Sequence, residues 1–368
     1  MPATRPVPSK GPSKGRSKGV RALKRGVPGA GGGGSGGSGG AERWQSKDLI
    51  GLQGVSAAQI RALLLASRGR VDITTDVTDS TLAGTTIANL FFEDSTRTRT
   101  SFTTAAHRLR AHVSNLLGAF SSVTKGETLI DTARNVEAMG VHALVIRARQ
   151  GGAAGLIAKN VRCPVVNAGD GRHEHPTQGL LDVYTLAEAT GRLDDFDLRG
   201  LTVAIVGDIV SSRVARSNIA GLTALGADVV CVGPAGLAPR SLESLAESGP
   251  GAGLVRVSQD FDAVLPEADA VMMLRVQFER HGGGGEGASK NSPSIASIRE
   301  YRSFFGMTAA RAERMKAGAI VMHPGPINRG LELDPEVADG PRSVILRQVS
   351  VGVGVRMAVL EACAAASA

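Results

Sequence analysis

The chain has 368 residues, which is long enough for about two domains with buried cores. Its formal net charge of +8 lies in the N-terminal tail, because eight basic residues precede the first acidic residue, Glu42, and the rest is balanced. The high isoelectric point therefore does not indicate that the body of the chain binds nucleic acid. The three cysteines lie far apart without a CxxC pair, which argues against a disulfide scaffold and fits a reducing compartment. No run of about 18 apolar residues occurs, so we predict no membrane span.

Residues 1–41 are of low complexity, with a Pro/Lys/Gly segment followed by a Gly/Ser run. Such a sequence buries too little apolar area to offset the entropy lost on ordering, so we predict a disordered tail. The tail lacks the apolar core of a secretory signal, and its Pro and Gly residues disfavour an amphipathic transit helix, so we expect a cytoplasmic protein. A weak electrostatic role with polyanions is the alternative for this segment.

From Trp44 onward, short Val/Ile-rich runs alternate with longer segments of helical spacing. The predicted strands are Thr86–Phe92, Ala143–Arg147, Val165–Asn167, Thr202–Gly207, Asp228–Val232, Ala270–Leu274 and Ala319–His323. The predicted helices include Ser101–Arg110, Thr128–Met139, Thr177–Thr190 and Arg213–Leu225. The alternation indicates an α/β fold with two domains, each a parallel sheet flanked by helices, linked by interdomain helices. We expect a first domain over 42–178, a second over 192–341, and a C-terminal helix within 342–368 that packs back on the first.

The segment 91–99 (FFEDSTRTR) follows a predicted strand and precedes a predicted helix. Ser95 is suited to the N-cap, where backbone N–H groups and the positive end of the helix dipole point outward. This arrangement binds phosphate, and hydroxyl and guanidinium groups in the same turn add donors. The alternative is a capped surface helix that carries two solvated arginines.

The segment 167–178 (NAGDGRHEHPTQ) ends a strand and opens a helix. His175 can donate a hydrogen bond to a developing oxyanion, and the Gln178 amide can form a hydrogen bond with an amine. His173 and His175 alternate like a metal-binding pair, but no third ligand is evident nearby, so we predict no metal. A histidine before proline is often structural, and that interpretation remains open from this segment alone.

Two arginines follow predicted strands of the second domain. Arg213 follows a strand by way of a short loop, and Arg275 follows the next apolar strand directly. A dicarboxylate needs such cationic, preferably bidentate partners, although either residue alone fits an ordinary surface arginine. The glycine-rich segment 281–289 after Arg280 is expected to be a mobile surface loop.

The 91–99 motif resembles the carbamoyl-phosphate signature of the aspartate and ornithine carbamoyltransferases, and the resemblance continues through nearly all of residues 44–362. It implies two α/β domains and a direct transfer without cofactor or metal. It also implies that the carbamoyl-phosphate site consists of Ser95, Thr96, Arg97, Thr98, Arg147, His175, Gln178, Pro324 and Gly325. Within that set, the residues expected to act in catalysis are Thr98, Arg147 and His175. The sequence at 148–150 departs from many members of the family.

The same resemblance implies an aspartate site. Its residues are Arg213, Arg275, Gln277 and the catalytic Lys125, with Arg280 ordering the adjoining loop. The segment 121–125 resembles the part of the aspartate enzymes in which Ser121 and Lys125 reach a neighbouring subunit's site, which implies a homotrimer. A larger assembly with regulatory or dihydroorotase chains stays open at this point. The motif 323–330 (HPGPINRG) lacks the cysteine of the ornithine enzymes and implies a cis Gly325–Pro326 bond. The expected product is N-carbamoyl-L-aspartate, an early intermediate of pyrimidine synthesis.

Three alternatives belong to other functional classes. The segment 201–208 resembles the first strand of a dinucleotide-binding fold, but no G-x-G-x-x-G follows it, which argues against an NAD-dependent oxidoreductase. An inactive paralogue that keeps only the fold is disfavoured, because every matched position keeps its residue type. A nucleic-acid-binding protein is supported only by the tail, since the body has no recognition motif.

Overall fold

The computed structural model describes residues 43–78, 80–117, 127–276 and 298–367. It contains two sheets that are parallel throughout, with strand orders β2-β1-β3-β4 and β7-β6-β5-β8-β9. The first sheet comprises β1 (Thr86–Phe91), β2 (His112–Leu117), β3 (Ala143–Ala148) and β4 (Val165–Asp170). The second comprises β5 (Thr202–Val206), β6 (Asp228–Val232), β7 (Val255–Ser258), β8 (Ala270–Met273) and β9 (Ile320–Met322). The predicted α/β fold with two parallel sheets is confirmed.

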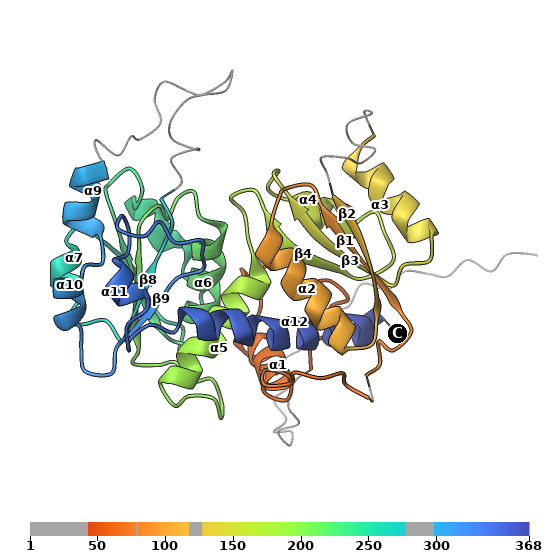
Figure 1. Cartoon of the computed structure of the whole chain (residues 1–368), viewed down its shortest axis with the longest axis horizontal. Coiled ribbons are helices and arrows are strands. Elements are labelled where there is room, and N and C mark those ends of the chain that lie inside the picture. Colours follow the sequence, from red (N-terminus) through yellow and green to blue (C-terminus); the bar gives the residue numbers. More distant parts are fainter. Residues whose placement is uncertain (1–42, 79, 118–126, 277–297, 368) are drawn as a thin grey trace, which may run out of the picture. The chain divides into compact units, whose positions relative to one another are not determined.

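Helices flank both sheets (Figure 1). In the first half of the chain they are α1 (Ala57–Arg68), α2 (Thr96–Arg108), α3 (Leu129–Ala138), α4 (Ala153–Ala158) and α5 (Pro176–Ala189). In the second half they are α6 (Arg213–Ala224), the 3-10 helix η3 (Arg240–Leu245), α7 (Phe261–Val264), α9 (Ile298–Phe305), α10 (Ala309–Glu313), α11 (Pro335–Ala338) and α12 (Ile345–Ser367). The predicted seven strands and four helices are all present, with ends shifted by a few residues, and α2 begins before the predicted Ser101.

Two strands were missed. The β2 strand, HVSNLL, lies at the edge of the first sheet, and the Oδ1 of its exposed Asn115 accepts a hydrogen bond of 2.8 Å from Asn89 Nδ2 of β1. The β7 strand has four residues, none of them fully buried, at the sheet edge. Neither strand has the continuous apolar run by which the others were found, because both lie at a sheet edge and carry exposed polar side chains.

The domain boundaries stay a prediction, although β1–β4 lie within 42–178 and β5–β9 within 192–341. The α5 and α6 helices pack together, and a continuous apolar cluster reaches from Val145 in β3 to Val203 in β5. Hence the carboxyl ends of strands from both sheets are held on one scaffold. The predicted tail over 1–41 lies outside the described residues.

The C-terminal helix α12 packs against α1, α2 and α5 (Figure 1). It is the one described helix long and apolar enough to cross a membrane, but 56% of its most apolar window is buried in the protein. Its fit against the other helices identifies α12 as a core helix and explains its apolar composition. It covers Ile345–Ser367, within the predicted range 342–368.

Gly354 is the point of closest approach between α12 and the chain after α1. A Cβ atom there would overlap the backbone of Val71. We therefore expect Gly354→Ala to lower the free energy of unfolding by about 1–3 kcal/mol, as overpacking does. The matched control is Gly69→Ala, because a Cβ at Gly69 meets no atom within 4 Å. Equal thermal melts for the two variants would contradict this packing.

Candidate active site

The two sheets direct the ends of their strands toward a cavity of about 1330 Å³. Side chains that follow β1, β3, β4, β5, β8 and β9 line it, as expected for open parallel sheets, where ligands bind beyond the carboxyl ends of the strands. Its lining includes seven arginines but only two acidic residues, Glu93 and Asp94. Such a cavity favours ligands that carry several negative charges.

The N-terminus of α2 forms one wall. Ser95 is its N-cap residue, in an extended conformation (φ −161°), and its side chain makes no capping hydrogen bond. The first N–H groups of α2 therefore point out of the helix beside a serine hydroxyl, which is a ready site for a phosphate-like anion. In the same turn, burial and the facing charge of Arg275 lower the pKa of Arg97. That mutual repulsion is relieved when anions bind beside these arginines.

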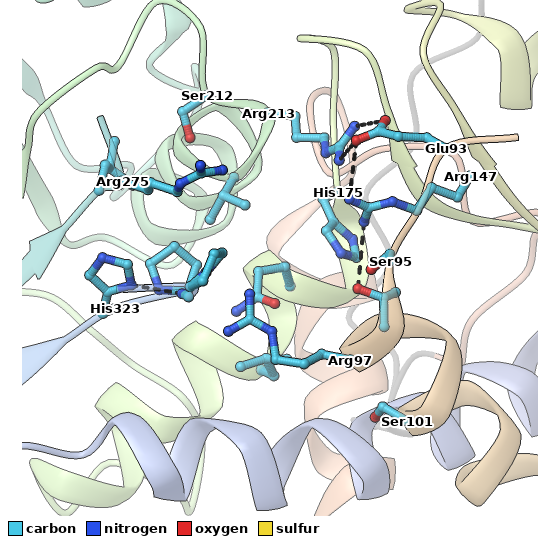
Figure 2. A pocket seen from close by; sticks show the side chains of 18 of the residues that line it. Glu93, Ser95, Arg97, Ser101, Arg147, His175, Ser212, Arg213, Arg275 and His323 are labelled. Atoms are coloured by element: carbon cyan, nitrogen blue, oxygen red, sulfur yellow. Dashed lines mark hydrogen bonds and ion pairs between the residues drawn. The ribbon is translucent and has the colours of Figure 1, made fainter. Parts of the chain in front are cut away.

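Arg147, at the end of β3, connects this wall to the rest of the cavity. Its Nη1 donates to Thr98 Oγ1 at 3.5 Å and to the Ala168 carbonyl oxygen at 3.1 Å, and its Nη2 lies 3.3 Å from Glu93 Oε1. Glu93 also accepts two hydrogen bonds from Arg213, of 2.9 and 3.0 Å (Figure 2). One carboxylate thus holds two guanidinium groups, one from β3 and the other from α6.

His175 is the N-cap residue of α5 and is 4% exposed. Burial lowers its pKa well below the usual 6.5, and the charges of Arg147, Arg356 and Arg213 lower it further. The imidazole is therefore neutral at physiological pH and carries one N–H donor. No residue in the described ranges bonds its buried Nδ1 atom, whereas its backbone N–H donates to Ser217 Oγ at 2.9 Å. Figure 2 shows the ring beside Arg147, where it can donate a hydrogen bond to a polarised carbonyl oxygen.

The opposite wall comes from the second sheet and includes Arg275 and the loop after β9 (Figure 2). The Gly325–Pro326 peptide bond is cis, as predicted. Gly325 has φ +70°, and a Cβ there would overlap the Arg97 guanidinium group, so only glycine allows both to keep these positions. His323 Nδ1 accepts the Gly325 N–H at 2.7 Å, which ties the loop to a buried side chain.

Both halves of the chain match models of one known protein family. Residues 47–188 match the aspartate/ornithine carbamoyltransferase carbamoyl-P binding domain, and residues 199–363 match the Asp/Orn binding domain of the same family. The chain belongs to the aspartate/ornithine carbamoyltransferase family.

Individual relatives match this chain over most of their own length. The chain is 54% identical to the aspartate carbamoyltransferase catalytic subunit of Myxococcus xanthus, over 87% of this chain and 100% of that protein. It is 48% identical to the subunit of the same name from Halothermothrix orenii, over 85% and 94% of the two chains. Among solved structures, aspartate transcarbamoylase of Trypanosoma cruzi in complex with carbamoyl aspartate and phosphate superposes with a TM-score of 0.73 at 31% identity, over 87% of this chain and 96% of that one.

The structure gathers most of the site residues that the sequence indicated. The residues that line the cavity are Ser95, Thr96, Arg97, Thr98, Arg147, His175, Gln178, Arg213, Arg275, Pro324 and Gly325. Ser121, Lys125, Gln277 and Arg280 lie outside the described residues. The roles assigned to all of these residues stay predictions.

His173 does not join His175 in a metal-binding pair. It is exposed and lies 3.2 Å from both carboxylate oxygens of Asp170, whose hydrogen bond raises its pKa. Across the described ranges, no group of three or more His, Cys, Asp or Glu residues could hold a metal ion.

Several other residues line the cavity without a role assigned from the sequence, and Glu93, Gln348 and Arg356 are three of them. Glu93 stands within the 91–99 motif, but its partner Arg213 is 120 positions away. Gln348 and Arg356 lie on α12, whose buried polar face is hidden in an otherwise apolar sequence. A polar residue within an apolar helical run was the available signal, since such a residue needs a buried partner.

Proposed function

We propose that this chain is an aspartate carbamoyltransferase, which converts carbamoyl phosphate and L-aspartate to N-carbamoyl-L-aspartate and phosphate. The observation that carries the proposal is a single arginine-rich cavity with a helix N-terminus on one wall and Arg275 on the other. Such a cavity can hold an acyl phosphate and a dicarboxylate side by side. The full-length match to aspartate carbamoyltransferase catalytic subunits supports the same activity.

Carbamoyl phosphate fits the wall formed by α2. Its phosphate group is bound by the first N–H groups of α2, the hydroxyls of Ser95 and Thr96, and the Arg97 guanidinium group. Its carbonyl oxygen then faces Thr98, Arg147 and His175. Gln178 and the carbonyl groups of Pro324 and Gly325 serve the carbamoyl NH2 group as acceptors.

L-aspartate fits the opposite side, where Arg213 and Arg275 bind its carboxylates. Lys125 and Gln277 complete this site in the proposal. Ornithine is disfavoured, because it has only one carboxylate for these two arginines and brings a second, cationic amino group into a cavity that already contains seven arginines.

The reaction is a nucleophilic acyl substitution without a covalent enzyme intermediate. The neutral amine of aspartate attacks the carbonyl carbon, and negative charge collects on the carbonyl oxygen of the tetrahedral intermediate. Arg147 and the neutral His175 stabilise that charge by donating hydrogen bonds. The C–O bond to phosphate then breaks, phosphate leaves with the electron pair, and the proton released by the amine can pass to phosphate. Holding both substrates in place supplies much of the remaining acceleration.

We further propose a cytoplasmic homotrimer in which Ser121 and Lys125 of each chain reach the neighbouring chain's cavity, with the product entering pyrimidine synthesis. The support is the resemblance of the 121–125 segment to that part of the aspartate enzymes. An assembly with regulatory or dihydroorotase chains belongs to the same proposal. A mass of three chains in sedimentation, and loss of turnover in Lys125→Ala, are the expected results.

The activity is tested by supplying carbamoyl phosphate with either L-aspartate or L-ornithine and identifying the product by mass. We expect carbamoylation of L-aspartate at least about 10³-fold faster in kcat/KM, since buried polar groups left unpaired by the wrong substrate discriminate strongly. Preferred turnover of L-ornithine, or turnover of neither amine, would overturn the proposal.

A further inference from the structure

Asp182 is a buried carboxylate that does not line the cavity but bonds to residues that do. It lies on α5, one turn after Gln178, and is 1% exposed. Its Oδ1 accepts from Gln178 Nε2 at 2.9 Å and from Gln348 Nε2 at 2.7 Å, and its Oδ2 accepts from Asn218 Nδ2 at 2.8 Å. Three carboxamides from three helices therefore present their NH2 groups to one carboxylate.

The chemistry of the two groups fixes the orientation of each amide. An ionised carboxylate only accepts hydrogen bonds, whereas a carboxamide has a donor end and an acceptor end, so only the NH2 end can face Asp182. Gln348 shows the consequence. Its Nε2 donates to Asp182, and its Oε1 accepts the backbone N–H of His323 at 3.0 Å.

Gln178 is held in the same way, but its other end faces no protein donor. Its Nε2 is bound to Asp182, it lines the cavity, and no residue of the described chain donates to its Oε1. That oxygen is therefore the end left for a ligand. A ligand NH2 group is its natural partner, because it supplies the donor that the oxygen lacks.

Asp182 remains ionised at neutral pH. Burial raises its pKa to about 6, while the three carboxamides and the charge of Arg356 oppose that rise. Arg356 is itself buried and lines the cavity, so a cation lies near this carboxylate without occupying its oxygens.

We propose that Asp182 is a positioning residue that sets the direction of the Gln178 amide, so that its oxygen accepts from the carbamoyl NH2 group and the site selects a carbamoyl group over an acetyl group. The inference rests on the proposed function. It adds an element of substrate selectivity that lies outside the cavity, in the hydrogen-bond acceptor behind Gln178.

The test compares carbamoyl phosphate with acetyl phosphate, which replaces the NH2 group by a methyl group of similar size. The carbamoyl-phosphate KM and the inhibition constant of acetyl phosphate against it are measured for wild type and Asp182→Asn. An asparagine can turn its own NH2 group toward Gln178 and so let that amide reverse. We expect Asp182→Asn to weaken the binding of carbamoyl phosphate by roughly tenfold or more relative to the binding of acetyl phosphate. This is the size expected when the NH2 group of the ligand meets the NH2 group of a reversed Gln178 amide.

Two further variants separate orientation from a general structural effect. Asn218→Ala removes another donor to the same carboxylate without freeing Gln178, and it should leave the ratio of the two constants unchanged. In a Gln178→Met background no amide remains to be oriented, so adding Asp182→Asn should no longer change the ratio. Should Asp182→Asn not melt cooperatively, Asp182→Ser is used with the same expectation, because the small polar space left behind admits water.

The proposal is overturned if Asp182→Asn leaves the ratio unchanged, if Asn218→Ala changes it equally, or if the change persists in the Gln178→Met background. The last result would assign the effect to Gln348 and the His323 loop. Failure of the proposed function can be distinguished from failure of the Asp182 proposal. In that case the wild-type protein would not use carbamoyl phosphate at all.

Discussion

Arg147→Ala is expected to lower kcat/KM for carbamoyl phosphate by about 10²- to 10³-fold, the effect of removing one preorganised donor from a developing oxyanion. Arg147 is placed for this role because its guanidinium group contacts Thr98, the Ala168 carbonyl oxygen and Glu93 together. The fold should survive, because Glu93 keeps both of its hydrogen bonds to Arg213 and is not left as an uncompensated charge. Steady-state kinetics with varied carbamoyl phosphate measure the loss.

Arg149→Ala is the matched control for that variant. Arg149 lies two positions further along, lines the same cavity and is exposed to solvent. A solvated charge acts mainly through long-range attraction, so we expect a change of a few-fold that shrinks as salt is added. Equal losses in the two variants would mean that Arg147 contributes only to the overall field and does not bind the reacting group.

Arg275→Ala should raise the KM for L-aspartate by roughly 10²-fold or more, as expected when a desolvated cation that binds a carboxylate is removed. The KM for carbamoyl phosphate should change far less, because Arg275 lies across the cavity from the N-terminus of α2. Arg275→Lys should recover only part of the loss, since an ammonium group cannot form the paired hydrogen bonds of a guanidinium group. Separate titrations of the two substrates measure this split.

The control for Arg275 is Arg256→Ala, which removes an exposed arginine of β7 that pairs with Glu267 away from the cavity. Such surface pairs contribute about 0–1 kcal/mol, and neither KM should move. Equal increases in both KM values for Arg275→Ala would contradict an aspartate-specific role and indicate a general loss of cavity structure.

Much of the site could be predicted because its residues stand next to strand ends and helix starts. Ser95 precedes α2, Arg147 ends an apolar run, and His175 precedes α5. In a parallel sheet these positions meet at one edge, so local sequence carries spatial information. The family resemblance added identities that spacing alone did not decide, such as the choice between a surface arginine and a carboxylate-binding one.

The parts that could not be predicted depend on contacts between distant positions. Glu93 joins Arg147 and Arg213, and Asp182 joins Gln178 to Gln348, which lies 166 positions from Asp182. A single acidic residue on a helix looks like part of a solvated face until the packing of α5 against α6 and α12 is known. Such buried polar networks follow from tertiary structure and leave little periodic signal in the sequence.

One cavity is proposed to hold carbamoyl phosphate and L-aspartate together for the transfer. A crystal structure with N-(phosphonacetyl)-L-aspartic acid, which joins a phosphonate to the aspartate moiety, tests it most directly. We expect the phosphonate at the N-terminus of α2 near Ser95 and Arg97, and the aspartate carboxylates against Arg213 and Arg275. A molecule bound in the reverse direction, or bound outside this cavity, would contradict it.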